Sequence, residues 1–144
     1  MILKDEEATA QAGAALAAVV RPGDVITLSG PLGVGKTALA RGLIRALGHR
    51  GEVPSPSFAL VQPYEDLHPP LWHVDLYRIE DVSEIEQLGL DAVVDSVVIV
   101  EWPERAGEDT WPGALRLSLD FGQNGDRSLT AEVPPAWEDR WPLR

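Results

Sequence analysis

In the N-terminal part of the chain, apolar residues follow first a helical and then a strand-like spacing. Asp5 is a favourable N-cap residue, and the apolar residues after it recur at helical intervals. Arg21-Pro22-Gly23 ends this predicted helix. The run Val25-Ile26-Thr27-Leu28-Ser29 is typical of a buried strand. A second amphipathic helix is predicted to begin near Lys36 and to stop at Gly48. This order of helix, strand, loop and helix predicts an α/β domain.

The later part of the chain is expected to form short strands and loops, because ten of the twelve prolines lie at or beyond Pro54. Ser83, with Glu86 three residues on, predicts a capping box for a short helix through Leu88. Ser96–Val100 is continuous and largely β-branched, which is typical of a strand covered on both faces in a parallel sheet. Strands are expected at Phe58–Gln62, Leu71–Leu76, Val97–Val100, Ala114–Asp120 and Leu129–Val133.

Composition narrows the class of protein. Lys and Arg number 12 against 23 Asp and Glu, so the formal net charge is −11, which disfavours direct binding to nucleic acid or anionic lipid. The absence of cysteine excludes disulfides, thiolate zinc sites and a cysteine nucleophile, and favours a reducing compartment. The N-terminal residues do not resemble a signal peptide, and the longest apolar run, Ala12–Val20, is too short to span a membrane. We expect a cytoplasmic protein with no membrane contact.

The chemistry is concentrated in one glycine-rich loop. Residues 30–37 read Gly-Pro-Leu-Gly-Val-Gly-Lys-Thr, which matches G-x-x-x-x-G-K-[ST] between a predicted strand and a predicted helix. Glycines let successive N–H groups turn toward phosphate oxygens at a helix N-terminus. Lys36 then supplies a charge to the β- and γ-phosphates, and Thr37 a hydroxyl ligand for Mg²⁺. The alternative is a glycine-rich turn with a surface lysine. The residues expected to bind phosphate are Leu32, Gly33, Val34, Gly35, Lys36 and Thr37.

This loop indicates the fold class. We expect one P-loop ATPase domain over residues 1–144, with an α/β, P-loop NTPase-like fold. Its central, mostly parallel sheet should carry flanking helices and a C-terminal antiparallel part. The tail from Pro134, with Trp137 and Trp141, either packs as a lid over an exposed sheet edge or frays.

A P-loop also needs a carboxylate at the end of a neighbouring buried strand. Two residues fit, because Glu101 follows one apolar run and Asp75 follows another. His73 is read as a core histidine, with a general base as the less favoured alternative. Trp102 either lies near the nucleotide or packs, and Glu104 is expected at the surface.

Two further segments are candidates for the site. Ser55-Pro56-Ser57-Phe58 follows the P-loop helix, where nucleotide-binding proteins place a loop that senses the γ-phosphate, and Ser57 offers the hydroxyl. A simple Ser-Pro turn is the alternative. Arg41, Arg45 and Arg50 form a basic cluster that is read as a solvated face, or else as a docking point for a partner.

Four sequence blocks together resemble the bacterial TsaE family, formerly called YjeE. They are the P-loop, Ser55-Pro56-Ser57-Phe58, His73-Val74-Asp75-Leu76-Tyr77-Arg78 and Glu101-Trp102-Pro103-Glu104, in the family's order and spacing. The resemblance extends from about Asp5 to Arg127. The family usually has Thr at the position of Ser57, so the hydroxyl is retained and a methyl group is lost.

The resemblance implies a small Mg-ATP-dependent ATPase that supports formation of N6-threonylcarbamoyladenosine in tRNA. In that family the ATPase binds a heterodimer of TsaB and TsaD, TsaD performs the transfer, and the ATPase meets tRNA only indirectly, through the complex. By matching position, Lys36, Asp75 and Glu101 would be catalytic, with Thr37 and Glu101 at Mg²⁺. Thr9, Ser57 and Arg127 would join the P-loop in contacting the nucleotide.

Two other functions remain open on this loop. A small-molecule kinase would usually carry an arginine-bearing lid, but only Arg78 occurs between Asp75 and Glu101. A nucleotide-dependent switch or scaffold would hydrolyse little. A GTP-driven switch should show an Asn-Lys-x-Asp motif, which the sequence lacks. Since no arginine finger is evident, we expect hydrolysis that is slow alone and faster with partners.

Overall fold

The computed structural model describes residues 1–90, 94–107 and 110–143. Its strands form one seven-stranded sheet in the order β1-β7-β6-β2-β5-β4-β3. The strands are β1 (Ile2–Leu3), β2 (Val25–Ser29), β3 (Val61–Tyr64), β4 (Leu71–Asp75), β5 (Val97–Glu101), β6 (Leu115–Phe121) and β7 (Arg127–Glu132). The helices are α1 (Glu6–Leu16), α2 (Lys36–Ala46) and the short α3 (Ser83–Glu86), with 3₁₀ turns η2 (Pro103–Ala106) and η3 (Pro135–Trp137).

Parallel strands occupy the centre of the sheet. β6, β2, β5 and β4 pair in parallel, whereas β7 and β1 continue antiparallel at one edge and β3 pairs antiparallel at the other. The predicted α/β fold, with a parallel centre and an antiparallel C-terminal part, is therefore confirmed. The antiparallel β3 edge is an additional feature.

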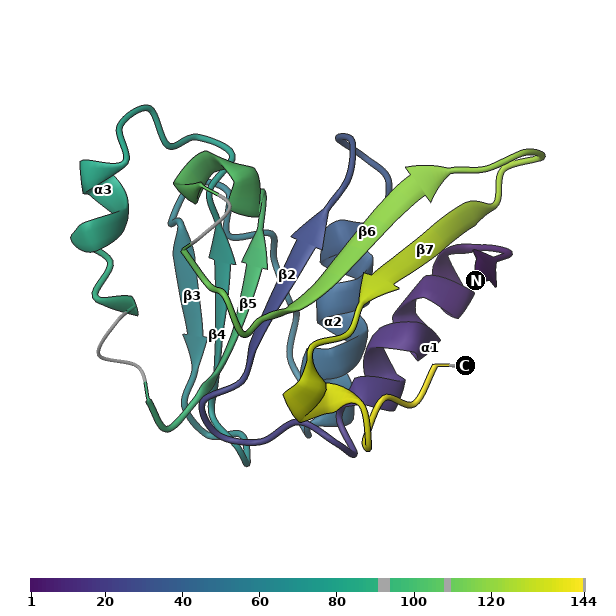
Figure 1. Cartoon of the computed structure of the whole chain (residues 1–144), viewed down its shortest axis with the longest axis horizontal. Helices are drawn as coiled ribbons and strands as arrows, with labels where there is room; N and C mark the ends of the chain where they lie inside the picture. The colour runs from purple at the N-terminus through teal and green to yellow at the C-terminus, as the bar shows by residue number, and fades with distance from the viewer. Residues whose placement is uncertain (91–93, 108–109, 144) are drawn as a thin grey trace.

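Helices α1 and α2 pack together behind one face of the sheet (Figure 1). Their apolar side chains form the main core with Ile26 and Leu28 of β2 and Leu115 of β6. A second, smaller core on the other face joins Val74, Val98 and other residues to the α3 region. All five residues of β5 are buried, as expected for a strand covered on both faces. No helix in the described part of the chain has the length and apolar character needed to cross a membrane.

The end of α1 and the start of β3 differ from the prediction. Helix α1 ends at Leu16, because the chain already turns over residues 17–19 before it reaches Arg21-Pro22-Gly23. The strand predicted from Phe58 begins only at Val61, since the preceding residues form a turn that puts Leu60 in the left-handed region, with φ 67°.

The capping box predicted for α3 is wrong. Val82 is the N-cap and makes no side-chain cap, and the helix ends at Glu86. The backbone N–H of Ser83, which Glu86 would accept in a capping box, donates instead to Oδ1 of Asp81 at 2.9 Å. The carboxylate of Glu84 accepts hydrogen bonds from the backbone N–H groups of Glu80 and Asp81, ahead of the helix. Asp81 therefore takes the role predicted for Glu86, and the hydroxyl of Ser83 does not cap the helix.

The C-terminal tail packs against the main core. Trp137 of η3 is 1% exposed, and Trp141 lies against the same cluster. The guanidinium of Arg140 stacks 3.9 Å from the ring centre of Trp137 and forms two bonds of 2.7 and 2.8 Å with the carboxylate of Asp24. The tail is thus held by apolar packing and by the contacts of Arg140.

Candidate nucleotide-binding site

The N-terminus of α2 is open to an anion. Its N-cap, Gly35, has φ 117°, a conformation that a residue with a side chain rarely adopts, and it makes no side-chain cap. Helix α1 differs, because the carboxylate of Asp5 accepts the N–H of Ala8 at 2.8 Å. The first N–H groups of α2 therefore have no side-chain acceptor at the cap, which is the arrangement that binds phosphate.

A cavity of about 530 Å³ lies in front of this helix end. The P-loop, the start of α1, the carboxyl ends of β4 and β5 and the start of β7 all contribute to its wall. Every residue predicted for the site lies on it: Thr9, Leu32, Gly33, Val34, Gly35, Lys36, Thr37, Ser57, Asp75, Glu101 and Arg127. The structure thus brings together residues that are far apart in the sequence, and their roles remain predictions.

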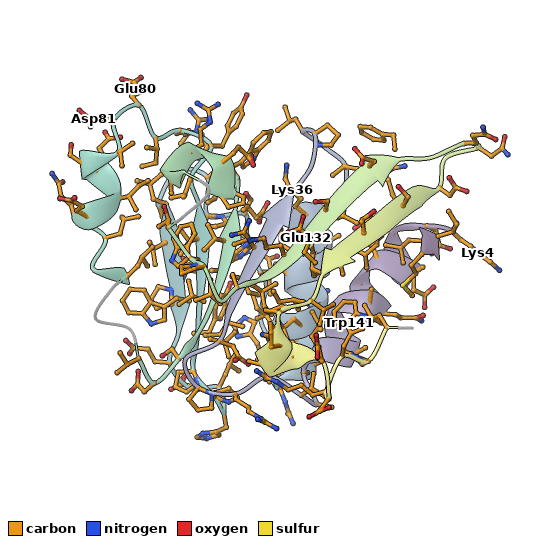
Figure 2. The ribbon with its side chains drawn as sticks, in the orientation of Figure 1. Lys4, Lys36, Glu80, Asp81, Glu132 and Trp141 are labelled. Carbon is orange, nitrogen blue, oxygen red and sulfur yellow. The ribbon has the colours of Figure 1, made fainter. Side chains whose placement is uncertain are left out.

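Lys36 is folded back onto its own loop. Its Nζ donates to the carbonyl oxygens of Gly30 and Pro31 and lies 3.5 Å from the ring centre of Trp102. Figure 2 shows Lys36 close to the carboxyl end of β2. Burial lowers the pKa of the Lys36 ammonium, and the nearby carboxylates, that of Glu101 first, oppose this shift. The charge is therefore held near the expected phosphate position by contacts that a phosphate could replace.

Glu101 accepts hydrogen bonds from two sides. The Thr37 hydroxyl donates to its Oε1 and Oε2, at 3.1 and 3.0 Å. The Nε2 atom of His73 lies 2.6 Å from Oε2. Both Glu101 and His73 are buried, at 2% and 0% exposure. The carboxylate is therefore fixed at the end of β5, next to the first turn of α2.

These groups fit Mg²⁺ held together with a nucleotide. Hydroxyl and carboxylate oxygens are ligands that Mg²⁺ prefers, and the ion commonly uses one or two protein ligands with phosphates and water. The described residues contain no cluster of three or more His, Cys, Asp or Glu side chains that could hold a metal by itself. Thr37 and Glu101 therefore suit a metal that arrives with phosphate.

Asp75 lies at the end of β4, beside Glu101 in the parallel register. It is 4% exposed, and its Oδ1 accepts the backbone N–H of Tyr77 at 2.9 Å. Burial raises the pKa of Asp75, the Tyr77 bond opposes the rise, and the charge of Glu101 adds to it. A buried carboxyl with a raised pKa at a cavity wall is a candidate general base.

The remaining predicted contacts differ in their surroundings. Arg127 donates from Nε to the P-loop carbonyl of Val34 at 3.0 Å, so it contacts the loop as well as the cavity. The Thr9 hydroxyl donates to the backbone oxygen of Asp5 at 3.2 Å. Ser57 is half-buried in the turn before β3.

Sequence reasoning left several cavity residues unassigned. Arg41 was expected on a solvated face with Arg45 and Arg50. It is half-buried, donates to the backbone oxygen of Val53 and lies on the cavity wall. Arg45 and Arg50 are exposed. Trp102, for which a place near the nucleotide was one of two interpretations, lies on the cavity wall beside Lys36. The other unassigned wall residues are Asp5, Glu6, Ala38, Ser55, Tyr77, Arg78 and Gly125.

The fold and the site define a P-loop nucleotide-binding protein of the α/β class. The profile of the family described as threonylcarbamoyl adenosine biosynthesis protein TsaE matches residues 3–129. A Streptomyces coelicolor protein named tRNA threonylcarbamoyladenosine biosynthesis protein TsaE is 46% identical over 135 residues, which cover 90% of each chain. The Bacillus subtilis protein of that name is 39% identical over 116 residues, covering 79% of this chain and 72% of its own.

A solved structure agrees with these relatives. The crystal structure of YdiB from Bacillus subtilis superposes with a TM-score of 0.82 at 30% identity, covering 96% of this chain and 88% of its own. This chain therefore belongs to the TsaE family of tRNA threonylcarbamoyladenosine biosynthesis, and the resemblance of its four sequence blocks is confirmed.

Proposed function

We propose that this protein is an ATPase that binds and hydrolyses Mg-ATP to support threonylcarbamoyladenosine formation in tRNA by a TsaB–TsaD complex in the cytoplasm. Residues 1–144 would act as one ATPase domain. The observation that carries this proposal is the cavity, which joins an uncapped helix N-terminus, Lys36 and the Thr37–Glu101 pair. Membership of the TsaE family supports the place in tRNA modification.

Binding would begin with the phosphates. The N–H groups at the start of α2 and the ammonium of Lys36 would receive them, as Lys36 exchanges its bonds to Gly30 and Pro31 for phosphate oxygens. Thr37 and Glu101 would hold Mg²⁺, which when bound neutralises charge on the β- and γ-phosphates. Thr9, Ser57 and Arg127 would complete the nucleotide contacts from the cavity wall.

Hydrolysis would use Asp75. Its buried carboxyl, with a raised pKa, is suited to orient a water and to accept a proton from it. Three arginines line the described cavity, and each already makes a contact within the protein: Arg41 with the Val53 carbonyl, Arg78 over the ring of Phe58 and Arg127 with the Val34 carbonyl. None is arranged as an arginine finger, so turnover should be slow until partner proteins bind and supply or reorient a charge.

The net charge of −11 favours contact with tRNA through partners. Nucleic-acid-binding surfaces are usually basic, because they neutralise phosphates with Lys and Arg. An acidic protein can serve RNA chemistry when TsaB and TsaD provide the contacts to RNA. We therefore place this chain in the complex as the nucleotide-dependent component.

The test is phosphate release from ATP with and without the TsaB and TsaD proteins. We expect weak hydrolysis alone, stimulation by the two partners together, and loss of both in Lys36→Ala. Lys4→Ala removes an exposed lysine that is not among the described residues lining the cavity, and it is the matched control (Figure 2). Full stimulated hydrolysis by Lys36→Ala would contradict the assignment of the loop. Phosphate transfer only to an added small-molecule acceptor would instead favour a kinase.

A further inference from the structure

His73 occupies a core position although its ring is polar. It lies on β4 between Leu71 and Asp75, on the same face of the strand, and pairs in register with Ile99 of β5. Leu71 and Ile99 both belong to the main core, and the His73 side chain is completely buried. An apolar side chain would satisfy this position without placing ring nitrogens in the core.

The ring makes one short bond and leaves its other nitrogen without a partner. An ionised carboxylate can only accept, so the 2.6 Å contact with Glu101 Oε2 assigns the proton to Nε2 of His73. The Nδ1 atom is buried and has no hydrogen-bond partner among the described residues. An unpaired buried nitrogen destabilises the fold, so the ring is unfavourable for packing alone. The favourable interaction that this histidine adds is its hydrogen bond to Glu101.

That bond completes the support of the Glu101 carboxylate. The Thr37 hydroxyl bonds to both oxygens, whereas His73 bonds to Oε2 alone. Oε1 is therefore the oxygen with more remaining acceptor capacity. His73 is absent from the described residues that line the cavity, so it has no direct access to a nucleotide there.

We propose that His73 is a positioning residue, which holds the carboxylate of Glu101 in the orientation that serves Mg²⁺ bound with the nucleotide. The proposal rests on the proposed function, because it assumes that Glu101 assists Mg²⁺. Residues that support a metal-binding side chain in this way typically change metal affinity by about 10–100-fold when they are replaced.

The test measures ADP affinity by titration calorimetry with Mg²⁺ and with a chelator. His73→Leu removes the donor, whereas the carboxamide nitrogen of His73→Gln can occupy the place of Nε2. We expect His73→Leu to reduce the Mg²⁺-dependent gain in ADP affinity by about 10-fold or more and to leave ADP affinity in chelator unchanged. His73→Gln should retain most of the Mg²⁺-dependent gain. If His73→Leu does not fold, His73→Asn replaces it, because its shorter amide cannot reach Glu101.

Two controls separate positioning from a general loss of structure. Leu71→Ala disturbs the same strand in the core and should lower ADP affinity equally with and without Mg²⁺, if it lowers it at all. In a Glu101→Gln background, His73→Leu should add no further loss of the Mg²⁺-dependent gain. The proposal is overturned if His73→Leu weakens binding equally in both conditions, if its effect adds fully to that of Glu101→Gln, or if Gln fails as Leu does. A wild-type protein that shows no Mg²⁺ dependence would instead refute the proposed function.

Discussion

Replacement of Gly42 by Ala tests the close packing of α1 and α2. Glycines on the two helices allow their backbones to approach each other. A Cβ built on Gly42 would overlap the carbonyl oxygen of Ala10 and lie 2.7 and 2.8 Å from that residue's carbonyl carbon and Cα. A Cβ on Gly13 would likewise overlap the backbone oxygen of Leu39. Since these neighbours are backbone atoms, a methyl group fits only if the helices move apart.

Two opposing effects set the magnitude for Gly42→Ala. Alanine is favoured over glycine inside a helix by about 1 kcal/mol. Overpacking a tight core costs about 1–3 kcal/mol, and contacts with three backbone atoms place this site in the upper half of that range. The expected net loss is about 1–2 kcal/mol, which lowers the melting temperature of a domain of this size by roughly 3–8 °C.

The assay is thermal and urea unfolding of Gly42→Ala beside Gln11→Ala. Gln11 is exposed on α1, so its replacement should change stability by no more than about 0.5 kcal/mol. Nucleotide affinity should also fall in Gly42→Ala, because a shift of α1 moves Thr9. Thr9 lies close to the P-loop, since its methyl group would be 3.5 Å from a Cβ built on Gly35. A Gly42→Ala variant that melts above the wild type would show that helix propensity prevails, and the close-packing argument would then be wrong.

Three other changes have defined outcomes. Trp137→Ala should lower the free energy of unfolding by about 3–5 kcal/mol in urea titrations, because it empties a fully buried site; a loss below about 1 kcal/mol would mean that the tail does not hold the core. Thr37→Ala should raise the Mg²⁺ concentration needed for half-maximal hydrolysis by about 10-fold or more, and an unchanged requirement would remove Thr37 from the metal site. Asp75→Asn should abolish most hydrolysis yet stabilise the fold at neutral pH. Because the pKa of Asp75 is raised in the folded state, the folded wild type loses stability as pH rises above the ordinary value of 3.8. The melting temperature of Asp75→Asn relative to the wild type should therefore increase with pH, and the difference should disappear in acid. If the stability gain of Asp75→Asn instead increased toward acid pH, the direction of the Asp75 pKa shift would be wrong.

Much of the site could be predicted because its determinants are local. The P-loop spacing is contiguous, and carboxylates directly after apolar runs must lie at the ends of their strands. Asp75 and Glu101 are adjacent in the structure because β4 and β5 are neighbours in parallel register. The resemblance to the TsaE family added Thr9 and Arg127, which no local pattern identifies.

The features that were missed depend on tertiary contacts. A buried position could be predicted for His73, but its bond to Glu101 requires the strand order of the sheet. Ser83 and Glu86 carry a capping pattern, yet the backbone N–H of Ser83 donates to the carboxylate of Asp81 instead. Strand β3 begins late because Leu60 turns the chain, and nothing in the residue type of Leu60 favours a positive φ.

The distribution of charge connects the acidic composition with the site. The described cavity wall holds four basic side chains, Lys36, Arg41, Arg78 and Arg127, and four acidic ones, Asp5, Glu6, Asp75 and Glu101. The formal charge of −11 therefore arises entirely outside the cavity. Inside it, the N–H groups of α2 add partial positive charge to a balanced set of side chains, so a nucleotide phosphate is attracted locally. The remaining surface carries the excess acid and repels polyanions, which agrees with the proposal that tRNA is contacted through partner proteins.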